Sequence, residues 1–157
     1  MATIRPARLG EGASLTALCV RSKAHWGYDA AFMALSAAAL AVSENDIAAG
    51  LVLVAVDDAG RLLGTASVHP EGAIADLHQL FVDPPAIGSG AGRALFAAAT
   101  DLARRLGAGR MTILADPNAA AFYEHMGARF RSNEPSDAIP GRTLPFYDYD
   151  LTSEPRP

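Results

Sequence analysis

Cysteine, lysine and long hydrophobic runs are scarce or missing in this 157-residue sequence. The single cysteine, Cys19, cannot form an intrachain disulfide, which favours a reducing cytoplasm, and its apolar surroundings indicate a small buried hydrophobe rather than a reactive thiol. No apolar run reaches the roughly 18 residues that cross a membrane, and the N-terminal "MATIRPARLGEG" lacks the apolar core of a signal peptide. We therefore expect a cytoplasmic protein that does not bind membranes.

Excess positive charge is also absent, because the formal net charge is −4. A general nucleic-acid binder normally carries a basic patch, so we expect no nucleic-acid partner. Of 13 basic residues only Lys23 is a lysine, which in so alanine-rich a chain we attribute to genome composition. Length and a half-apolar composition predict one domain over residues 1–157, with its core at about 3–151 and a frayed tail at 152–157.

Hydrophobic periodicity and turn residues predict the order β, α, α, β, β, β, α, β, α, β, β. Along the strand "GAIADLHQLFV", alternation places Asp76, His78, Leu80 and Val82 on one face. The hairpins are antiparallel, whereas the strand–loop–helix–strand unit at 73–116 is a parallel crossover, so the sheet must be mixed. The expected segments are 3–7, 11–24, 28–45, 51–70 (a hairpin), 72–82, 93–108, 110–116, 117–128, 129–132 and 144–151.

A glycine-rich loop, "VDPPAIGSGAG", joins the strand that ends at Val82 to the next helix. The first N–H groups of a helix lack internal acceptors, and the helix dipole adds positive charge there. Glycine also lets a backbone approach a ligand closely. The loop is therefore either an anion cradle or merely a tight turn.

Two common phosphate motifs do not fit the loop. A P-loop needs Lys-[Ser/Thr] after its last glycine, and that pair is absent. A dinucleotide-binding fingerprint starting at Gly88 and Gly90 needs glycine at position 93, which is Arg93, and it would come too late in the chain for a doubly wound sheet.

The loop does match V-x-P-x-x-x-G-x-G-x-G, and so resembles the coenzyme A pyrophosphate loop of the GNAT superfamily of N-acetyltransferases. "DPNAAAFYEHMGARF" resembles the family's downstream motif, while "RSKAHWGYDAAFM" and "IPGRTLPFYDYDL" resemble segments of small bacterial members. The similarity runs from about Ile4 to Leu151. It implies a single-domain α+β (mixed α/β) fold, with a central, mixed, mostly antiparallel sheet flanked by about four helices.

The resemblance implies acetyl-CoA as co-substrate and no metal. One departure lies in the loop, where many members have Gln or Arg at the position of Ile87 and a basic residue at that of Ser89. The cradle acts mainly through backbone N–H groups, so we expect this departure to affect affinity more than activity class. The implied cofactor-binding residues are Leu80, Phe81, Val82, Ile87, Gly88, Ser89, Gly90, Ala91, Gly92, Arg93, Asn118, Phe122 and Tyr123.

Acetyl transfer to an amine needs a base, an oxyanion donor and an acid for the departing thiolate. The resemblance implies a backbone N–H near Phe81 or Val82 as the donor, and Tyr123 as the acid, since a phenol is protonated at neutral pH. Asp76 and His78 are candidates for the base or a proton relay. Each residue also has a structural alternative. Tyr123 could be a core aromatic, Asp76 a solvated carboxylate at the strand edge, and His78 a polar group whose hydrogen bonds are satisfied.

For the acceptor, the resemblance implies a cleft wall formed by the first helices, where His25, Trp26 and Tyr28 cluster. Rings there could contact an amine by cation–π interaction, although Trp26 could equally anchor the core. Arg142 could bind an acidic group of the acceptor, but pairing with Asp137 at the surface is our first interpretation. The expected partner is a small-molecule or peptide amine, and a homodimer is left open.

Three functions are consistent with these observations. The first is an acetyl-CoA-dependent N-acetyltransferase that works by direct transfer in a ternary complex. The second is a catalytically silent coenzyme A-binding sensor of the same fold, against which the intact Tyr123 argues. The third is an unrelated α/β binding module whose glycine loop is a structural turn, which predicts no binding of coenzyme A.

Overall fold

The computed structural model describes residues 2–152, and all its strands join one seven-stranded sheet in the order β1-β2-β3-β4-β5-β7-β6. Neighbouring strands are antiparallel except β4 and β5. The elements are β1 (Thr3–Pro6), α1 (Gly12–Ala24), α2 (Ala30–Leu40), α3 (Glu44–Ala48), β2 (Val52–Val56), β3 (Leu62–Glu71), β4 (Ile74–Val82), α4 (Ala91–Arg105), β5 (Arg110–Leu114), α5 (Ala120–His125), β6 (Arg129–Pro135) and β7 (Thr143–Asp150), with short 3-10 helices at Pro84–Ala86 and Pro117–Ala119.

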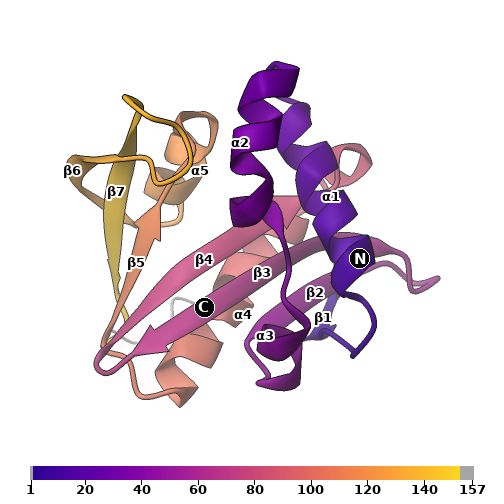
Figure 1. Cartoon of the computed structure of the whole chain (residues 1–157). Helices are drawn as coiled ribbons and strands as arrows, with labels where there is room; N and C mark the ends of the chain where they lie inside the picture. The colour runs from indigo at the N-terminus through magenta and orange to yellow at the C-terminus, as the bar shows by residue number, and fades with distance from the viewer. Residues whose placement is uncertain (1, 153–157) are drawn as a thin grey trace.

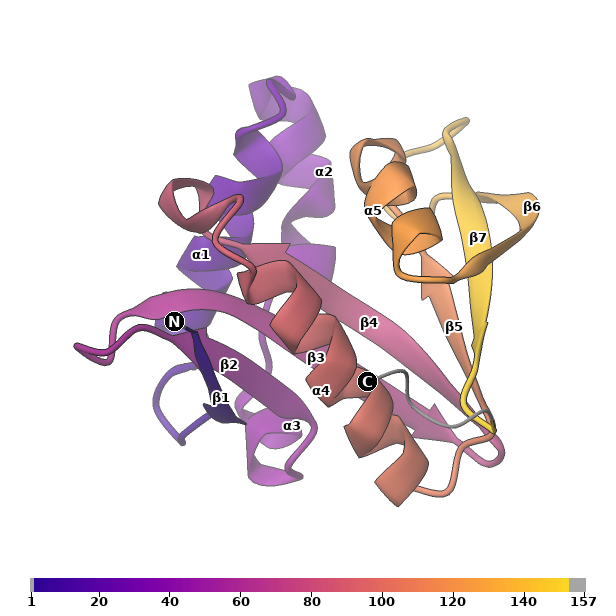
Figure 2. The same ribbon diagram turned by 180° about the vertical axis from the view of Figure 1, so that it is seen from behind.

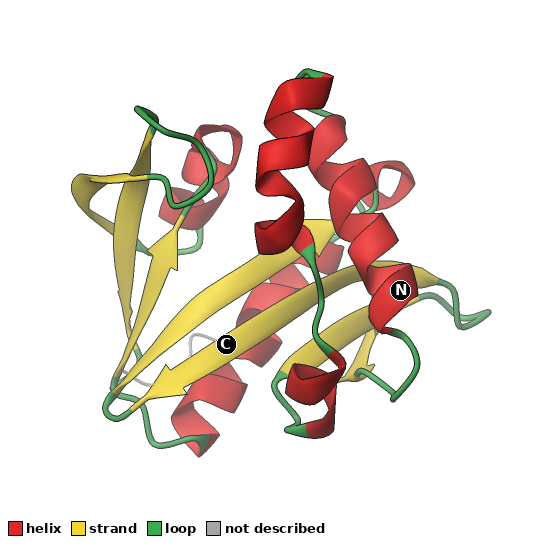
Figure 3. Cartoon of the chain, viewed as in Figure 1, coloured by secondary structure: helices red, strands yellow, loops and turns green. Residues whose placement is uncertain are grey.

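Helices cover both faces of the sheet. α1 and α2 lie side by side across β3 and β4 on one face (Figures 1 and 3), and α4 crosses β2, β3 and β4 on the other (Figure 2). The core is correspondingly divided. One cluster, around Leu95, Phe96 and Met111, lies on the α4 side, and the other, around Leu15, Cys19 and Val54, lies under α1 to α3. Burial raises the pKa of Cys19 to about 12, which makes it the inert hydrophobe expected.

A β-bulge interrupts β4 at His78. Ser67 of β3 pairs with Gln79 and the next residue, Val68, pairs with Leu77, so His78 is the extra residue. A bulge of this kind reverses the alternation of side chains along the strand. Gln79 consequently points towards the helices, where its amide donates to the carbonyl groups of Ala39 and Ala41 at the end of α2, at 3.0 and 2.9 Å.

The predicted facing of β4 is therefore partly wrong. Leu77 lies in the core on the α4 side, so Asp76 faces α1 to α3, whereas Leu80 and Val82 pack on the α4 side. Phe81 faces the cluster under the helices instead. The alternation of residue types in the sequence gives no sign of the extra residue at His78. It therefore could not show that Asp76 lies on the opposite face of the sheet from Leu80 and Val82.

β4 and β5 pair only at their starts, where Ile74–Asp76 lie beside Arg110–Thr112. Beyond that point the strands diverge, and β5, β7, β6 and α5 form a separate wing (Figures 1 and 2). The parallel crossover predicted for 73–116 is thus confirmed, but its two strands are joined over only a short stretch. Their divergence leaves the backbone at the end of β4 without a neighbouring strand on one side.

The predicted order of strands and helices is confirmed apart from one short helix, α3. The helix expected over 28–45 ends at Leu40 because Ala41 is extended, and the next N–H, of Val42, donates to the hydroxyl of Thr16 at 2.9 Å. Ser43 then caps a new helix by accepting from the N–H groups of Asn45 and Asp46. Within residues 2–152 no helix is both long and apolar enough to cross a membrane.

Candidate active site

A cavity of about 620 Å³ opens where β4 and β5 diverge. Its walls come from six parts of the chain: the α1 end, α2, β4, the glycine loop, the region from β5 to α5, and the loop between β6 and β7. Residues far apart in sequence therefore meet at one place.

The glycine loop forms one end of this cavity and leads into the first turn of α4. Gly88 and Gly90 have φ angles of +85° and +91°, which only glycine adopts readily. The hydroxyl of Ser89 accepts from the N–H of Ala91 at 3.3 Å. In the part of the chain that the structure describes, the N–H groups of Gly88, Gly90, Gly92 and Arg93 have no acceptor. The loop thus offers several N–H groups and the positive end of a helix dipole to an anion.

The end of β4 supplies backbone groups along the cavity wall. Asp83 N–H donates to Leu63 C=O of the β3 side at 2.8 Å. Because backbone groups alternate in direction along an antiparallel pair, Phe81 also bonds towards β3, whereas Leu80 and Val82 point to the gap beside β5. An oxyanion donor was expected from the sequence near Phe81 or Val82. Of these two, only Val82 has an N–H that faces the cavity, and the N–H of Leu80 faces it as well.

Tyr123 on α5 lines the same cavity. Its ring is packed against Phe96, Phe122 and Tyr147, and only 5% of the residue is exposed. Its hydroxyl has no hydrogen-bond partner among residues 2–152. Every fully buried polar side-chain atom in that range does have a partner, so the Tyr123 hydroxyl is not fully buried and reaches the cavity. Burial, reinforced by Asp116 and Asp76, raises the pKa of Tyr123 above its ordinary value, and the phenol stays protonated at neutral pH.

Asp76 and His78 reach the cavity from β4, next to a second histidine. The rings of His78 and His69 are stacked with centroids 4.1 Å apart, and His69 Nε2 lies 2.9 Å from Asp46 Oδ2. Burial, and then His69, lower the pKa of His78, so its imidazole is neutral at pH 7. Burial raises the pKa of Asp76, against a hydrogen bond from the Thr112 hydroxyl at 2.9 Å. A neutral imidazole can accept a proton.

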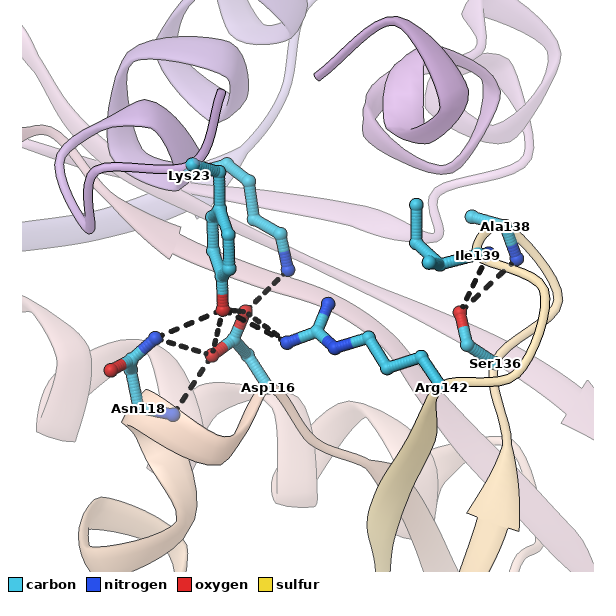
Figure 4. Close-up of polar contacts among 8 residues, drawn as sticks. Lys23, Asp116, Asn118, Ser136, Ala138, Ile139 and Arg142 are labelled. Carbon is cyan, nitrogen blue, oxygen red and sulfur yellow. Dashed lines mark hydrogen bonds and ion pairs between the residues drawn. The ribbon is translucent and has the colours of Figure 1, made fainter. Parts of the chain in front are cut away.

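Five polar residues form a hydrogen-bonded cluster, which we call the Asp116 cluster: Lys23, Tyr28, Asp116, Asn118 and Arg142. Figure 4 shows Lys23, Asn118 and Arg142 around the carboxylate of Asp116. Lys23 Nζ lies 2.5 Å from one carboxylate oxygen of Asp116, and Asn118 donates to the other through its backbone and its amide, at 2.8 and 2.9 Å. The Tyr28 hydroxyl donates to Asp116 at 2.9 Å. It also accepts from Asn118 at 3.0 Å and from Arg142 at 2.9 Å.

Two aromatic rings pack against the cations of the Asp116 cluster. Tyr28 and Phe32 are stacked with ring centroids 3.9 Å apart, and both cations lie over them, Lys23 at 5.1 Å from the Tyr28 centroid and Arg142 at 4.7 Å from that of Phe32. Burial alone would raise the pKa of Asp116, but its hydrogen bonds from Lys23 and Asn118 hold that pKa below the usual range. Asp116 is therefore a carboxylate at neutral pH.

Most of the residues that the sequence predicted for the site do lie around the cavity. The exceptions are Ser89 and Ala91, which the helix start keeps out of it, and His25, which packs edge-on against Trp26. Tyr28 reaches the site through the Asp116 cluster rather than by lining the cavity. The interpretation that Arg142 pairs with Asp137 is wrong, because its partners are Tyr28 and Asp116, whose carboxylate lies 3.7 Å away.

Sequence reasoning missed Lys23 and Asp116 as site residues. A usable signal existed for each. Lys23 is the only lysine. Asp116 comes two residues after the end of β5 at Leu114, at the edge of the sheet where functional carboxylates often lie. Neither signal identifies the partner, which comes from a distant segment. In the described part of the chain, no three His, Cys, Asp or Glu side chains are placed to hold a metal ion.

Comparisons with known proteins agree with this geometry. The sequence model of the acetyltransferase (GNAT) family matches residues 20–128, more than half of the chain, and the chain therefore belongs to that family. The resemblance noted in the sequence is thus confirmed. A comparison with curated proteins finds no match.

Solved structures share the fold. A GCN5-related N-acetyltransferase from Rhodopseudomonas palustris is 24% identical over 96% of each chain, with a TM-score of 0.77. PaiA N-acetyltransferase from Thermoplasma acidophilum, in complex with coenzyme A, is 15% identical over 96% of this chain and 99% of its own, with a TM-score of 0.78. YncA from Salmonella typhimurium, with its cofactor acetyl-CoA, is 24% identical over 100% and 98% of the two chains, with a TM-score of 0.71. The predicted mixed, mostly antiparallel fold is confirmed.

Proposed function

We propose that this protein is an acetyl-CoA-dependent N-acetyltransferase that transfers the acetyl group directly to the amine of a small molecule or peptide. Membership of the acetyltransferase family supports acyl transfer. The observation that carries the proposal is the unpartnered hydroxyl of Tyr123, which faces a cavity shared with the glycine loop and with Asp76 and His78. An acid, an anion cradle and a base candidate thus surround one space.

The free N–H groups of the glycine loop suit the pyrophosphate of coenzyme A, which PaiA and yncA hold in their structures. In this chain, Gly88, Gly90, Gly92 and Arg93 would bind that group, and the backbone of Leu80 and Val82 would hold the rest of the molecule along β4. The bound co-substrate supplies the thioester and its acetyl group. The N–H of Leu80 or Val82 would then stabilise negative charge as it develops on the carbonyl oxygen, and the direction of these groups towards the cavity supports this role.

The acceptor amine must lose a proton before or as it attacks, because a primary amine has a pKa of about 10.4. Asp76 or His78 takes that proton, directly or through water. The amine nitrogen then bonds to the carbonyl carbon, and the bond from that carbon to sulfur breaks. Tyr123 gives its proton to the departing sulfur and regains one, directly or through water, from the nitrogen, which is positively charged after the attack. The products are the neutral amide and the thiol, and the proton first taken from the amine leaves through the base.

We expect substitution of His78 by Gln to distinguish the two candidates for the base. A base works only when it is unprotonated, so kcat/KM should fall as the pH drops below the pKa of the base. Because the pKa of His78 is lowered, this fall (the acid limb) should lie below the ordinary histidine value of 6.5. If His78 is the base, H78Q should lower kcat/KM by about 10²-fold and remove that limb. If Asp76 is the base, H78Q should keep the limb and D76N should remove it. The measurement is kcat/KM against pH for the three proteins.

The binding half of the proposal is tested by calorimetric titration of cofactor-stripped protein with acetyl-CoA, with NADH as the control dinucleotide. Saturable binding of acetyl-CoA, and none of NADH, is the expected result. If folded protein binds neither, the glycine loop is only a structural turn. Binding without any transfer would favour the silent sensor. The homodimer left open by the sequence stays a prediction.

A further inference from the structure

The Asp116 cluster carries more positive than negative charge. Lys23 and Arg142 face a single carboxylate, Asp116, and the fourth polar partner, Tyr28, has a pKa raised by burial and is neutral. All three charged side chains are largely enclosed, with 14 to 19% of each exposed. Partly buried charge is costly unless it is balanced, so this cluster favours one more anion from outside the chain.

Arg142 has hydrogen-bond donors to spare for that anion. Only its Nη2 is engaged, by Tyr28 and Asp116, and within residues 2–152 its Nε and Nη1 have no partner. Figure 4 shows the guanidinium reaching from the β6–β7 loop towards Asp116 beneath the N-terminal helices. The loop itself is held in shape, because the Ser136 hydroxyl accepts from the N–H groups of Ala138 and Ile139 at 3.2 and 3.1 Å. A guanidinium held at such a place binds carboxylates well.

Lys23 departs from the composition of the whole chain. It is the only lysine among 13 basic residues, so arginine serves at every other basic position. An ammonium is a compact point charge, whereas a guanidinium is a broad planar fork. Nζ lies between Asp116 and the stacked rings of Tyr28 and Phe32. The compact ammonium of Lys23 thus fits between a carboxylate and two aromatic rings.

We propose that the acceptor carries a carboxylate near its amine, as an amino acid does, and that Arg142 and Lys23 bind this carboxylate. The inference rests on the proposed function and names the substrate class for the same cavity. Asp76, Tyr123 and the charged members of the Asp116 cluster all line the same cavity, so the base candidates and the cluster border one space. An amine at Asp76 and a carboxylate at Arg142 therefore suit a short molecule.

Other acidic groups on the cavity wall do not cancel this attraction. Asp76 lies at the amine end, where a negative charge favours the acceptor's cation before transfer. Asp137, in the β6–β7 loop, is exposed, and water screens its charge. The anion is therefore expected at Arg142 and Lys23, while the amine remains beside β4.

The test is calorimetric titration of the coenzyme A-saturated protein with pairs of product analogues. Each pair consists of an N-acetylated amino acid and its carboxamide, which are alike in size and shape but of which only the acid has a charged α-carboxylate. The pairs are prepared for glycine, alanine, methionine, glutamate and phenylalanine. We expect at least one carboxylate to bind about 10- to 100-fold more tightly than its carboxamide, the range typical of a charge-assisted contact. R142Q should reduce that ratio to near one, and R142K should keep part of it.

Two controls make the result specific to the cluster. R131Q removes an arginine of β6 that pairs with Asp148 at the surface, and it should keep the full ratio. The affinity for coenzyme A should be unchanged in R142Q, R142K and R131Q. Equal binding of every carboxylate and its carboxamide, a ratio that survives R142Q, or no binding of any carboxylate would overturn the proposal. If the wild-type protein does not bind coenzyme A at all, that result would instead refute the proposed function.

Discussion

Replacing Tyr123 by phenylalanine is expected to lower kcat by about 10²- to 10³-fold while leaving the affinity for acetyl-CoA unchanged. The hydroxyl faces the cavity without a partner, so its loss removes the proton donor for the departing sulfur and little else. Burial keeps the phenol protonated at neutral pH, which makes it a reliable acid there. The measurement is single-turnover kinetics with acetyl-CoA in excess, alongside a calorimetric titration.

Folding is not expected to obscure this result. The ring of Tyr123 packs against Phe96, Phe122 and Tyr147, and phenylalanine keeps that packing. The matched control is Tyr149→Phe, which removes a hydroxyl from β7 outside the cavity and should keep the full rate. A Y123F protein that retains wild-type kcat, with chemistry shown to limit the rate, would contradict the acid role.

Substituting Gly90 by valine should weaken acetyl-CoA binding by about 100-fold. Steric crowding is not the reason, since a Cβ at Gly90 would meet no heavy atom within 4 Å. The reason is the φ angle of +91°, which a β-branched residue tolerates poorly. When the loop relaxes to a negative φ, the N–H groups of Gly90 and Gly92 turn away from the pyrophosphate. The loss of two charge-assisted hydrogen bonds corresponds to about 3 kcal/mol or more.

A second glycine separates this effect from a general loss of stability. Gly60, in the turn between β2 and β3, has a φ of +83° and equally open surroundings, but it lies away from the cavity. G60V and G90V should therefore lower the melting temperature similarly, and only G90V should lose affinity for acetyl-CoA. Equal affinity in wild type and G90V would show that the loop conformation does not form the cradle.

Local patterns predicted the strands and helices and the glycine loop that leads into α4. The strand, glycine loop and helix at 72–108 are contiguous in sequence, and each follows from neighbouring residues. The bulge at His78 could not be predicted in this way, because it depends on how β4 pairs with β3. The alternation of apolar residues continues through an extra residue without a visible break. One such residue was enough to reverse the facing of Leu80 and Val82.

The Asp116 cluster illustrates a second limit of the sequence. Its members come from α1, from the loop before α2, from the segment after β5 and from the β6–β7 loop, up to 114 residues apart. Proximity in sequence favoured Asp137 as the partner of Arg142, whereas the fold brings Tyr28 and Asp116 to it. A cluster built by tertiary packing leaves only indirect marks in a single sequence, such as the solitary lysine.

Amine-dependent release of coenzyme A is the most direct test of the proposed activity. Purified wild-type protein would be given acetyl-CoA and a panel of amines that includes amino acids, their carboxamides and short peptides, with thiol release and acetylated product measured together. We predict thiol release that requires an amine and equals the acetylated product formed, with Y123F slower by about 10²-fold or more. Saturable acetyl-CoA binding without amine-dependent release for any member of the panel would contradict the account and identify the protein as a coenzyme A sensor.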